Sequence, residues 1–162
     1  MSKYQELSKT FAESVQLQAK YVSECCEFSN FLFSQMAEYL EWPRGQMAFA
    51  PDESAEIQES ICNSNSVRLR DDGNIYFWAL FTIIRSDNVN HRYQLIFPLK
   101  VKKLEDSFLL TITGLAEEVL LSTKDTGEMK NVYEALFAAM KTYFGTPYLD
   151  FTSEDFLRRT LP

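Results

Sequence analysis

Residues 3–41 contain neither glycine nor proline, so no residue in them breaks a helix. Apolar side chains recur there at steps of three, four or seven residues, which is the spacing of one helix face. We therefore predict an N-terminal helical region. A single helix of this length spans about 55–60 Å at about 1.5 Å per residue, more than the width of a domain of this size, so we expect a break near Cys25. The repeating apolar positions are Tyr4, Leu7, Phe11, Val15, Val22, Cys26, Phe33, Met36 and Leu40.

The second half of this region is apolar on nearly every side. Such a pattern exceeds what a helix needs to cover one face of a sheet. We expect burial against a sheet and against something else as well, such as a second subunit. The first set of candidate partner-binding residues therefore comprises Phe28, Phe31, Met36 and Tyr39.

After Pro43, which ends the helix, residues 44–65 resemble a linker that carries a short acidic helix around Ser54–Cys62. From Val67 the apolar period changes to two, which is typical of β-strands. Residues 75–84 are apolar on both faces and predict a central strand covered on each side. The expected strands, separated by turns rich in Asp, Asn, Ser and Gly, cover residues 67–70, 75–84, 91–102, 108–113 and 119–122.

Two helices are expected near the C-terminus. Asp125 followed by Glu128 matches an acidic capping box, and the helix it opens ends at Gly145. A last short helix begins at Thr152 and runs through Arg159. The sequence therefore predicts one α+β domain over residues 1–162, with a long N-terminal helical region, a four- to five-stranded antiparallel meander and a C-terminal helix packed on one sheet face. At the level of fold alone, this order and the acidic charge resemble small bacterial proteins that chaperone secretion substrates or neutralise toxins.

Charge is segregated along the chain. Residues 66–103 carry seven Lys or Arg and three Asp, a balance of 7 − 3 = +4, within a chain of net charge −7. The overall acidity argues against binding to duplex nucleic acid or to an anionic membrane surface, because both need a dominant positive field. A local basic segment in an acidic protein can instead mark an interaction surface.

The basic side chains of this segment are expected on one polar sheet face. Arg68 and Arg70 share a side of one strand, and Arg92, Lys100 and Lys102 share a side of another, which makes these five the second set of candidate partner-binding residues. Three interpretations stay open: charges that protect the sheet against edge-to-edge aggregation, a contact for an acidic protein segment, or a site for single-stranded nucleic acid. The last needs exposed aromatic side chains, for which Tyr76 and Trp78 are the candidates.

Few residues suggest catalysis or cofactor binding. His91 is the only histidine, and the five glycines are isolated, so neither a two-histidine metal site nor a phosphate-binding loop is expected. Cys25, Cys26 and Cys62 are expected to be reduced thiols in the core, and with His91 they lack the paired spacing of zinc ligands. We expect no catalytic residue, no metal and no cofactor.

The leading hypothesis is a non-enzymatic, cytoplasmic protein-binding module that acts as chaperone, inhibitor or regulator and forms a homodimer. No segment of the sequence approaches the roughly 20 apolar residues needed to span a membrane. The alternative is a carrier of a small apolar ligand, with a pocket between sheet and helices. An enzyme that uses carboxylates in the same pocket ranks third, and it requires a buried Asp or Glu with a raised pKa.

Overall fold

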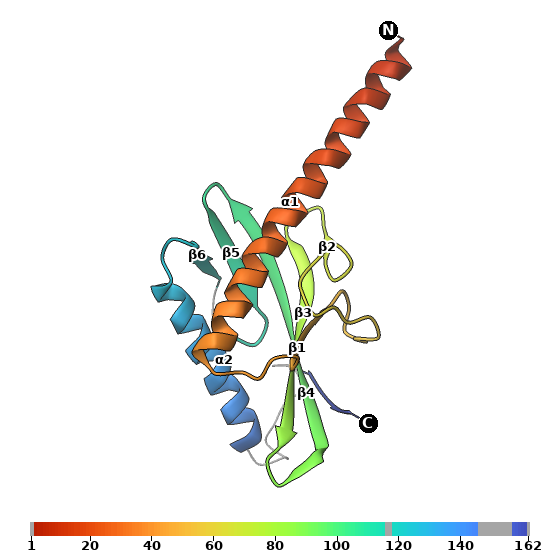
Figure 1. The fold of residues 1–162 in the computed structure, drawn as a ribbon. Helices are drawn as coiled ribbons and strands as arrows, with labels where there is room; N and C mark the ends of the chain where they lie inside the picture. The colour runs from red at the N-terminus through yellow and green to blue at the C-terminus, as the bar shows by residue number, and fades with distance from the viewer. Residues whose placement is uncertain (1, 116–117, 146–156, 162) are drawn as a thin grey trace.

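One antiparallel sheet with two helices forms the fold (Figure 1). The computed structural model describes residues 2–115, 118–145 and 157–161. The main strand order is β1-β3-β4-β5-β6, with β2 paired to β3 and β7 paired to β4. This confirms the predicted α+β class. The elements are α1 (Lys3–Tyr39), β1 (Met47–Ala50), β2 (Arg68–Leu69), β3 (Ile75–Arg85), β4 (Asn88–Leu104), β5 (Ser107–Ile112), β6 (Val119–Leu121), α2 (Gly127–Gly145) and β7 (Leu157–Leu161).

Helix α1 is continuous, and the break expected near Cys25 is absent from it. At about 1.5 Å per residue it is about 56 Å long. The helix accommodates this length by packing only its second half on the sheet, while its first half projects beyond the sheet edge (Figure 1). The N-terminus is capped by a reciprocal pair of hydrogen bonds between Ser2 and Gln5.

Both helices cover the same face of the sheet, which we call the inner face. The predicted alternation in β4 is confirmed, because Leu95, Phe97, Leu99 and Val101 are buried in the main core. The Tyr133 hydroxyl of α2 donates a hydrogen bond of 2.9 Å to the Leu32 carbonyl of α1, so the two helices also contact each other.

A single tyrosine fixes the point where α1 leaves the sheet. The Tyr21 hydroxyl donates to the Gly73 carbonyl at 2.5 Å and accepts from the Lys103 amide at 3.0 Å. One turn further along the helix, Glu24 forms an ion pair of 2.7 Å with the Lys103 side chain. These contacts join α1 to the turn before β3 and to the end of β4.

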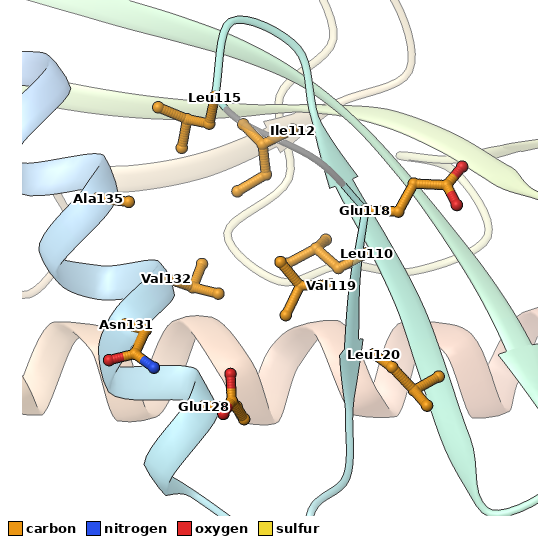
Figure 2. Close-up of a pocket in the computed structure, with 10 residues that line it drawn as sticks. All are labelled: Leu110, Ile112, Leu115, Glu118, Val119, Leu120, Glu128, Asn131, Val132 and Ala135. Carbon is orange, nitrogen blue, oxygen red and sulfur yellow. The ribbon is translucent and has the colours of Figure 1, made fainter.

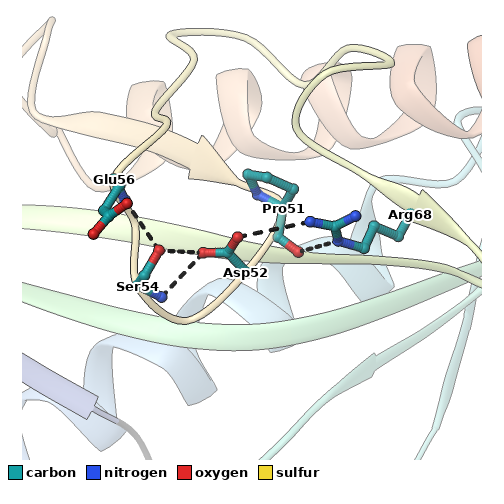
Figure 3. Close-up of polar contacts among 5 residues, drawn as sticks. All are labelled: Pro51, Asp52, Ser54, Glu56 and Arg68. Carbon is teal, nitrogen blue, oxygen red and sulfur yellow. Dashed lines mark hydrogen bonds and ion pairs between the residues drawn. The ribbon is translucent and has the colours of Figure 1, made fainter.

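The segment between β1 and β2 forms a loop where we expected an acidic helix. Its first part, around Ala55, covers the other, outer face of the sheet, and its second part, around Cys62, packs against α1. Ala55 of this loop forms a small apolar cluster on the outer face with Leu80 and Ile96, which lie opposite each other on β3 and β4. Asp52 accepts hydrogen bonds from Ser54 and forms a 3.7 Å ion pair with Arg68 (Figure 3). The Asp52 carboxylate thus accepts hydrogen bonds from the residues of a turn. The same residue pattern also occurs at the start of a helix, so the sequence did not distinguish the two.

Two strands lie outside the predicted meander. Strand β1 pairs with β3, with Met47 opposite Phe81, although its four residues fall in the predicted linker. At the C-terminus, the predicted helix is wrong at residues 157–159, because Leu157–Leu161 pair with β4 as β7. Cross-strand pairing with β4 overrides local helix signals there. The expected start of that helix, Thr152, lies outside the described residues. Among the described residues, no helix combines the length and the apolar character needed to cross a membrane.

Candidate protein-interaction surfaces

The projecting half of α1 carries an exposed apolar stripe. Every described residue from Ser2 to Lys20 is exposed. Tyr4, Leu7, Phe11 and Val15 recur on one face of this half and are 79%, 67%, 69% and 49% exposed. We call these four residues the α1 stripe. Further along the helix, the same face packs on the sheet, so the stripe continues a core-forming surface into solvent.

A groove of ≈ 600 Å³ lies at the base of the stripe. It runs between α1 and the segment that leads into β2, and Val15, Gln18, Ala19 and Val22 line its helix side. The stripe therefore ends in a concave surface, and the two are continuous at Val15.

The predicted helix set does not form one surface. Phe28 and Met36 are buried in the main core, at 2% and 0% exposure, and the Phe28 ring stacks on Phe108 with 4.2 Å between centroids. Phe31 is partly buried against the same core. Tyr39 is 43% exposed and donates a hydrogen bond to Glu134. The surplus apolar coverage of this half is explained by α2 and by the segment around Trp42, which cover the sides of the helix that the sheet leaves open.

Four of the five predicted basic residues gather on the outer sheet face, at the end near the β2–β3 turn. Arg68 lies opposite Tyr76, which in turn lies opposite Lys100. Arg92 is separated from Lys100 by eight residues along β4, or about 26 Å at about 3.3 Å per residue. It therefore does not contribute to the same cluster as Arg68, Arg70, Lys100 and Lys102.

Part of this basic cluster already has intramolecular partners. Arg68 is held by Asp52 and by the Pro51 carbonyl (Figure 3), and the Arg70 guanidinium lies 4.1 Å from the centroid of the Tyr76 ring. Among the residues that the structure describes, neither Lys100 nor Lys102 forms an ion pair. Both lysines are half-buried. The hydrogen bond from Tyr76 lowers the pKa of the Asp72 carboxyl, and Lys100 lies close enough to help lower it further.

Tyr76 and Trp78 also lie on the outer face and are half-buried. Tyr76 is covered in part by Arg70, and its hydroxyl donates to Asp72. Trp78 packs against the small cluster around Ala55. Neither ring therefore stands free as a stacking platform for bases.

A pocket of ≈ 420 Å³ opens between α2 and strands β5 and β6 (Figure 2). Its apolar wall includes Leu110, Ile112 and Val132, and the carboxylates of Glu118 and Glu128 lie at its edge. Both glutamates are exposed, so burial does not desolvate them. The alternative function requires a pocket between sheet and helices, and this pocket lies between the sheet and α2.

The thiols are distributed within the core. Cys62 donates a hydrogen bond to Cys26 over 3.5 Å, and this contact lowers the pKa of Cys26. Burial raises the pKa of the Cys25 thiol to about 11, so this group stays protonated at neutral pH.

His91 lies at the far end of β4 beside Tyr93 and Arg85. Within the described part of the chain, no three potential ligands gather around a metal-sized space.

Comparisons of the chain with protein-family models, with curated proteins and with solved structures found no match. The α1 stripe was recognised in the sequence as a helix face but not as a contact surface. The signal that could have identified it was the length of the helix, which exceeds what one sheet can cover.

Proposed function

We propose that the protein is a non-enzymatic protein-binding module and that the α1 stripe is its contact surface. The observation that carries the proposal is the exposure of Tyr4, Leu7 and Phe11 on a helix that leaves its own core. Monomeric proteins rarely expose contiguous apolar patches larger than a few hundred Å². Binding of a protein to the stripe removes this surface from water at a gain of roughly 25 cal/mol per Å².

The mode of recognition follows from the shape of the surface. A helix that presents apolar residues at i, i+3, i+7 and i+11 packs into an apolar groove or against another helix. A chaperone, inhibitor or regulator of a protein partner acts through such contacts without chemistry of its own. Lys100 and Lys102 on the outer sheet face provide a second, electrostatic contact for an acidic segment of the partner.

Affinity capture from the native host tests this proposal. We expect the wild-type chain to recover a protein that the Leu7→Glu/Phe11→Glu variant fails to recover, because two carboxylates in the stripe must lose their hydration on binding. Leu17→Glu is the matched control, because Leu17 is 68% exposed but lies off the stripe. A Lys100→Glu/Lys102→Glu variant measures the contribution of the basic cluster. Retention of every wild-type partner by the stripe variant contradicts the proposal.

A second candidate function is the carriage of a small apolar ligand in the pocket of Figure 2. Its volume of ≈ 420 Å³ lies within the range of about 300–1,000 Å³ that small-molecule sites occupy. The apolar wall suits a hydrocarbon body, and the glutamates at the edge favour a neutral or cationic head group over an anionic one.

Filling this pocket is expected to abolish ligand binding. Ala135 is an exposed α2 residue that lines the pocket, so Ala135→Trp fills it without changing a core residue. With the neutral fluorescent probe N-phenyl-1-naphthylamine, we expect saturable binding to the wild type and at least about tenfold weaker binding to this variant, or about 1.4 kcal/mol. Ala138→Trp, on the exposed side of α2, is the control. Equal probe binding by all three chains excludes the carrier function.

A further inference from the structure

We infer that the occupant of the α1 stripe is a second copy of this chain, in an antiparallel helix pair with its two-fold axis at Phe11. This inference rests on the proposed function, because it names the partner of the same surface. The exposed stretch of α1 runs from Ser2 to Lys20, and Phe11 lies at its centre. Tyr21 is the first residue of the helix that packs against its own fold.

The stripe is self-complementary about this centre. In an antiparallel pair, Phe11 meets Phe11 of the second copy, Leu7 lies opposite the second copy's Val15, and Tyr4 lies opposite its Gln18. A two-fold interface requires such reciprocity, because each patch must fit its own copy. The pairing sets Leu7, Phe11 and Val15 of each copy against an apolar residue of the other, and Tyr4 of each copy lies on Gln18 of the other.

The extent of the pair matches the space that is available. Ser2 of the second copy reaches only as far as Lys20, so its helix stops where the sheet begins. The stripe faces the side on which α1, further along, packs against the sheet. The second helix therefore continues the layer of the sheet beyond its edge, and it brings its Tyr4 to the groove that Gln18, Ala19 and Val22 line.

The charge pattern of the stripe favours a second copy of the chain over an acidic or a basic partner. The stripe holds no charged residue. Lys3 lies about 80° around the helix from Phe11, whereas Glu6, Lys9, Glu13 and Lys20 lie about 140–180° from it. A second copy therefore meets no charge along the stripe itself, and Lys3 is the charged residue of this half that lies beside it. Ser8, Ala12 and Ser14 flank the stripe, and their small side chains allow the helix axes to approach within the usual 8–10 Å.

The surface area that the helix pair buries sets the expected affinity of the dimer. Aromatic side chains bury about 150–250 Å² each, so with Leu7 and Val15 each copy contributes roughly 450 Å², or about 900 Å² for both. Specific interfaces below about 1,200 Å² belong to weak and transient complexes. We expect a reversible dimer with a dissociation constant on the order of micromolar.

Sedimentation velocity of the full chain tests the pairing. We expect the wild type to approach twice its 18.8 kDa mass as its concentration rises. Phe11→Glu places two carboxylates against each other at the two-fold axis, and it should weaken the dimer at least about 100-fold. Leu17→Glu introduces the same charge at a site of equal exposure, 68% against 69%, but about 120° around the helix, and it should leave the dimer intact.

A charge pair tests the antiparallel orientation. Leu7→Glu and Val15→Lys should each weaken the dimer, whereas the double variant should restore it, because each introduced glutamate faces the introduced lysine of the other copy. A parallel pair would place glutamate against glutamate, so further weakening in the double variant overturns the antiparallel arrangement.

The outcomes separate this inference from the proposed function. A wild-type chain that stays monomeric at about 100 μM, where a micromolar dimer is nearly complete, overturns the self-association. If that monomer still captures a different protein through the stripe, the proposed function stands and only the identity of the partner was wrong. If no association of any kind depends on Phe11, both fail.

Discussion

Replacing Phe81 by alanine is expected to lower the free energy of unfolding by about 4 kcal/mol, because a cavity opens at the centre of the aromatic core. Phe81 is fully buried, and its ring contacts those of Phe33, Trp42 and Phe97 at centroid distances of 6.1, 5.5 and 5.6 Å. It therefore joins α1, the segment after it, β3 and β4. Urea denaturation followed by tryptophan fluorescence measures the loss.

Phe137→Ala is the matched control for this experiment. Phe137 lies on α2 with 45% of its surface exposed, and its truncation should change the stability by no more than about 0.5 kcal/mol. A domain of this size has a stability of about 5–15 kcal/mol, so Phe81→Ala should still fold at low temperature. Equal urea midpoints for the two variants would show that Phe81 is not at the centre of the core.

Asn30→Ala is expected to cost about 3 kcal/mol and to release the loop before β2. The Asn30 side chain donates to the Cys62 carbonyl at 2.9 Å and accepts from the Cys62 amide at 2.7 Å. Cys62 is only 2% exposed, so without Asn30 its backbone N–H and C=O lose their partners at a largely buried position. Each buried polar group left unsatisfied costs about 1–3 kcal/mol.

The thiols provide a local measurement of this release. Cys62 belongs to the loop and Cys26 lies against it on α1, so both thiols should react faster with an aromatic disulfide reagent in Asn30→Ala than in the wild type. Asn65→Ala changes an exposed asparagine of the same loop and should leave both the stability and the thiol reactivity unchanged. Unchanged reactivity in Asn30→Ala would mean that other contacts hold the loop.

Local patterns predicted most of this fold. The alternation in residues 91–102 assigned Leu95, Phe97 and Leu99 to the core, and the turn residues separated all five expected strands. The two strands that the local patterns missed depend on contacts between residues far apart in the sequence. Strand β1 forms because Met47 pairs with Phe81, and β7 forms because it pairs with β4, and neither partner is adjacent in sequence. The break expected near Cys25 was wrong as well, because that prediction assumed that the helix must stay within the width of the domain.

The candidate surfaces were predicted less well than the fold. The periodicity of the apolar residues identified which of them share one face of α1. It did not show which half of that face the sheet covers. Phe28 and Phe11 belong to the same helix, yet one is 2% and the other 69% exposed. For the basic residues, period two placed Arg68 and Lys100 on one side correctly. The pairing of Arg68 with Asp52 depends on a loop whose course the sequence did not predict.

The continuity of α1 has a consequence for the entropy of binding. An isolated helix of about 19 residues is only marginally stable in water, because nucleation is unfavourable. Here the buried half of α1 supplies the nucleus, and Ser2 and Gln5 cap the free end. The stripe is therefore helical before it meets a partner, and the backbone ordering of about 1–2 kcal/mol per residue takes place during folding. Association then fixes few new degrees of freedom, which favours binding by an interface as small as this one.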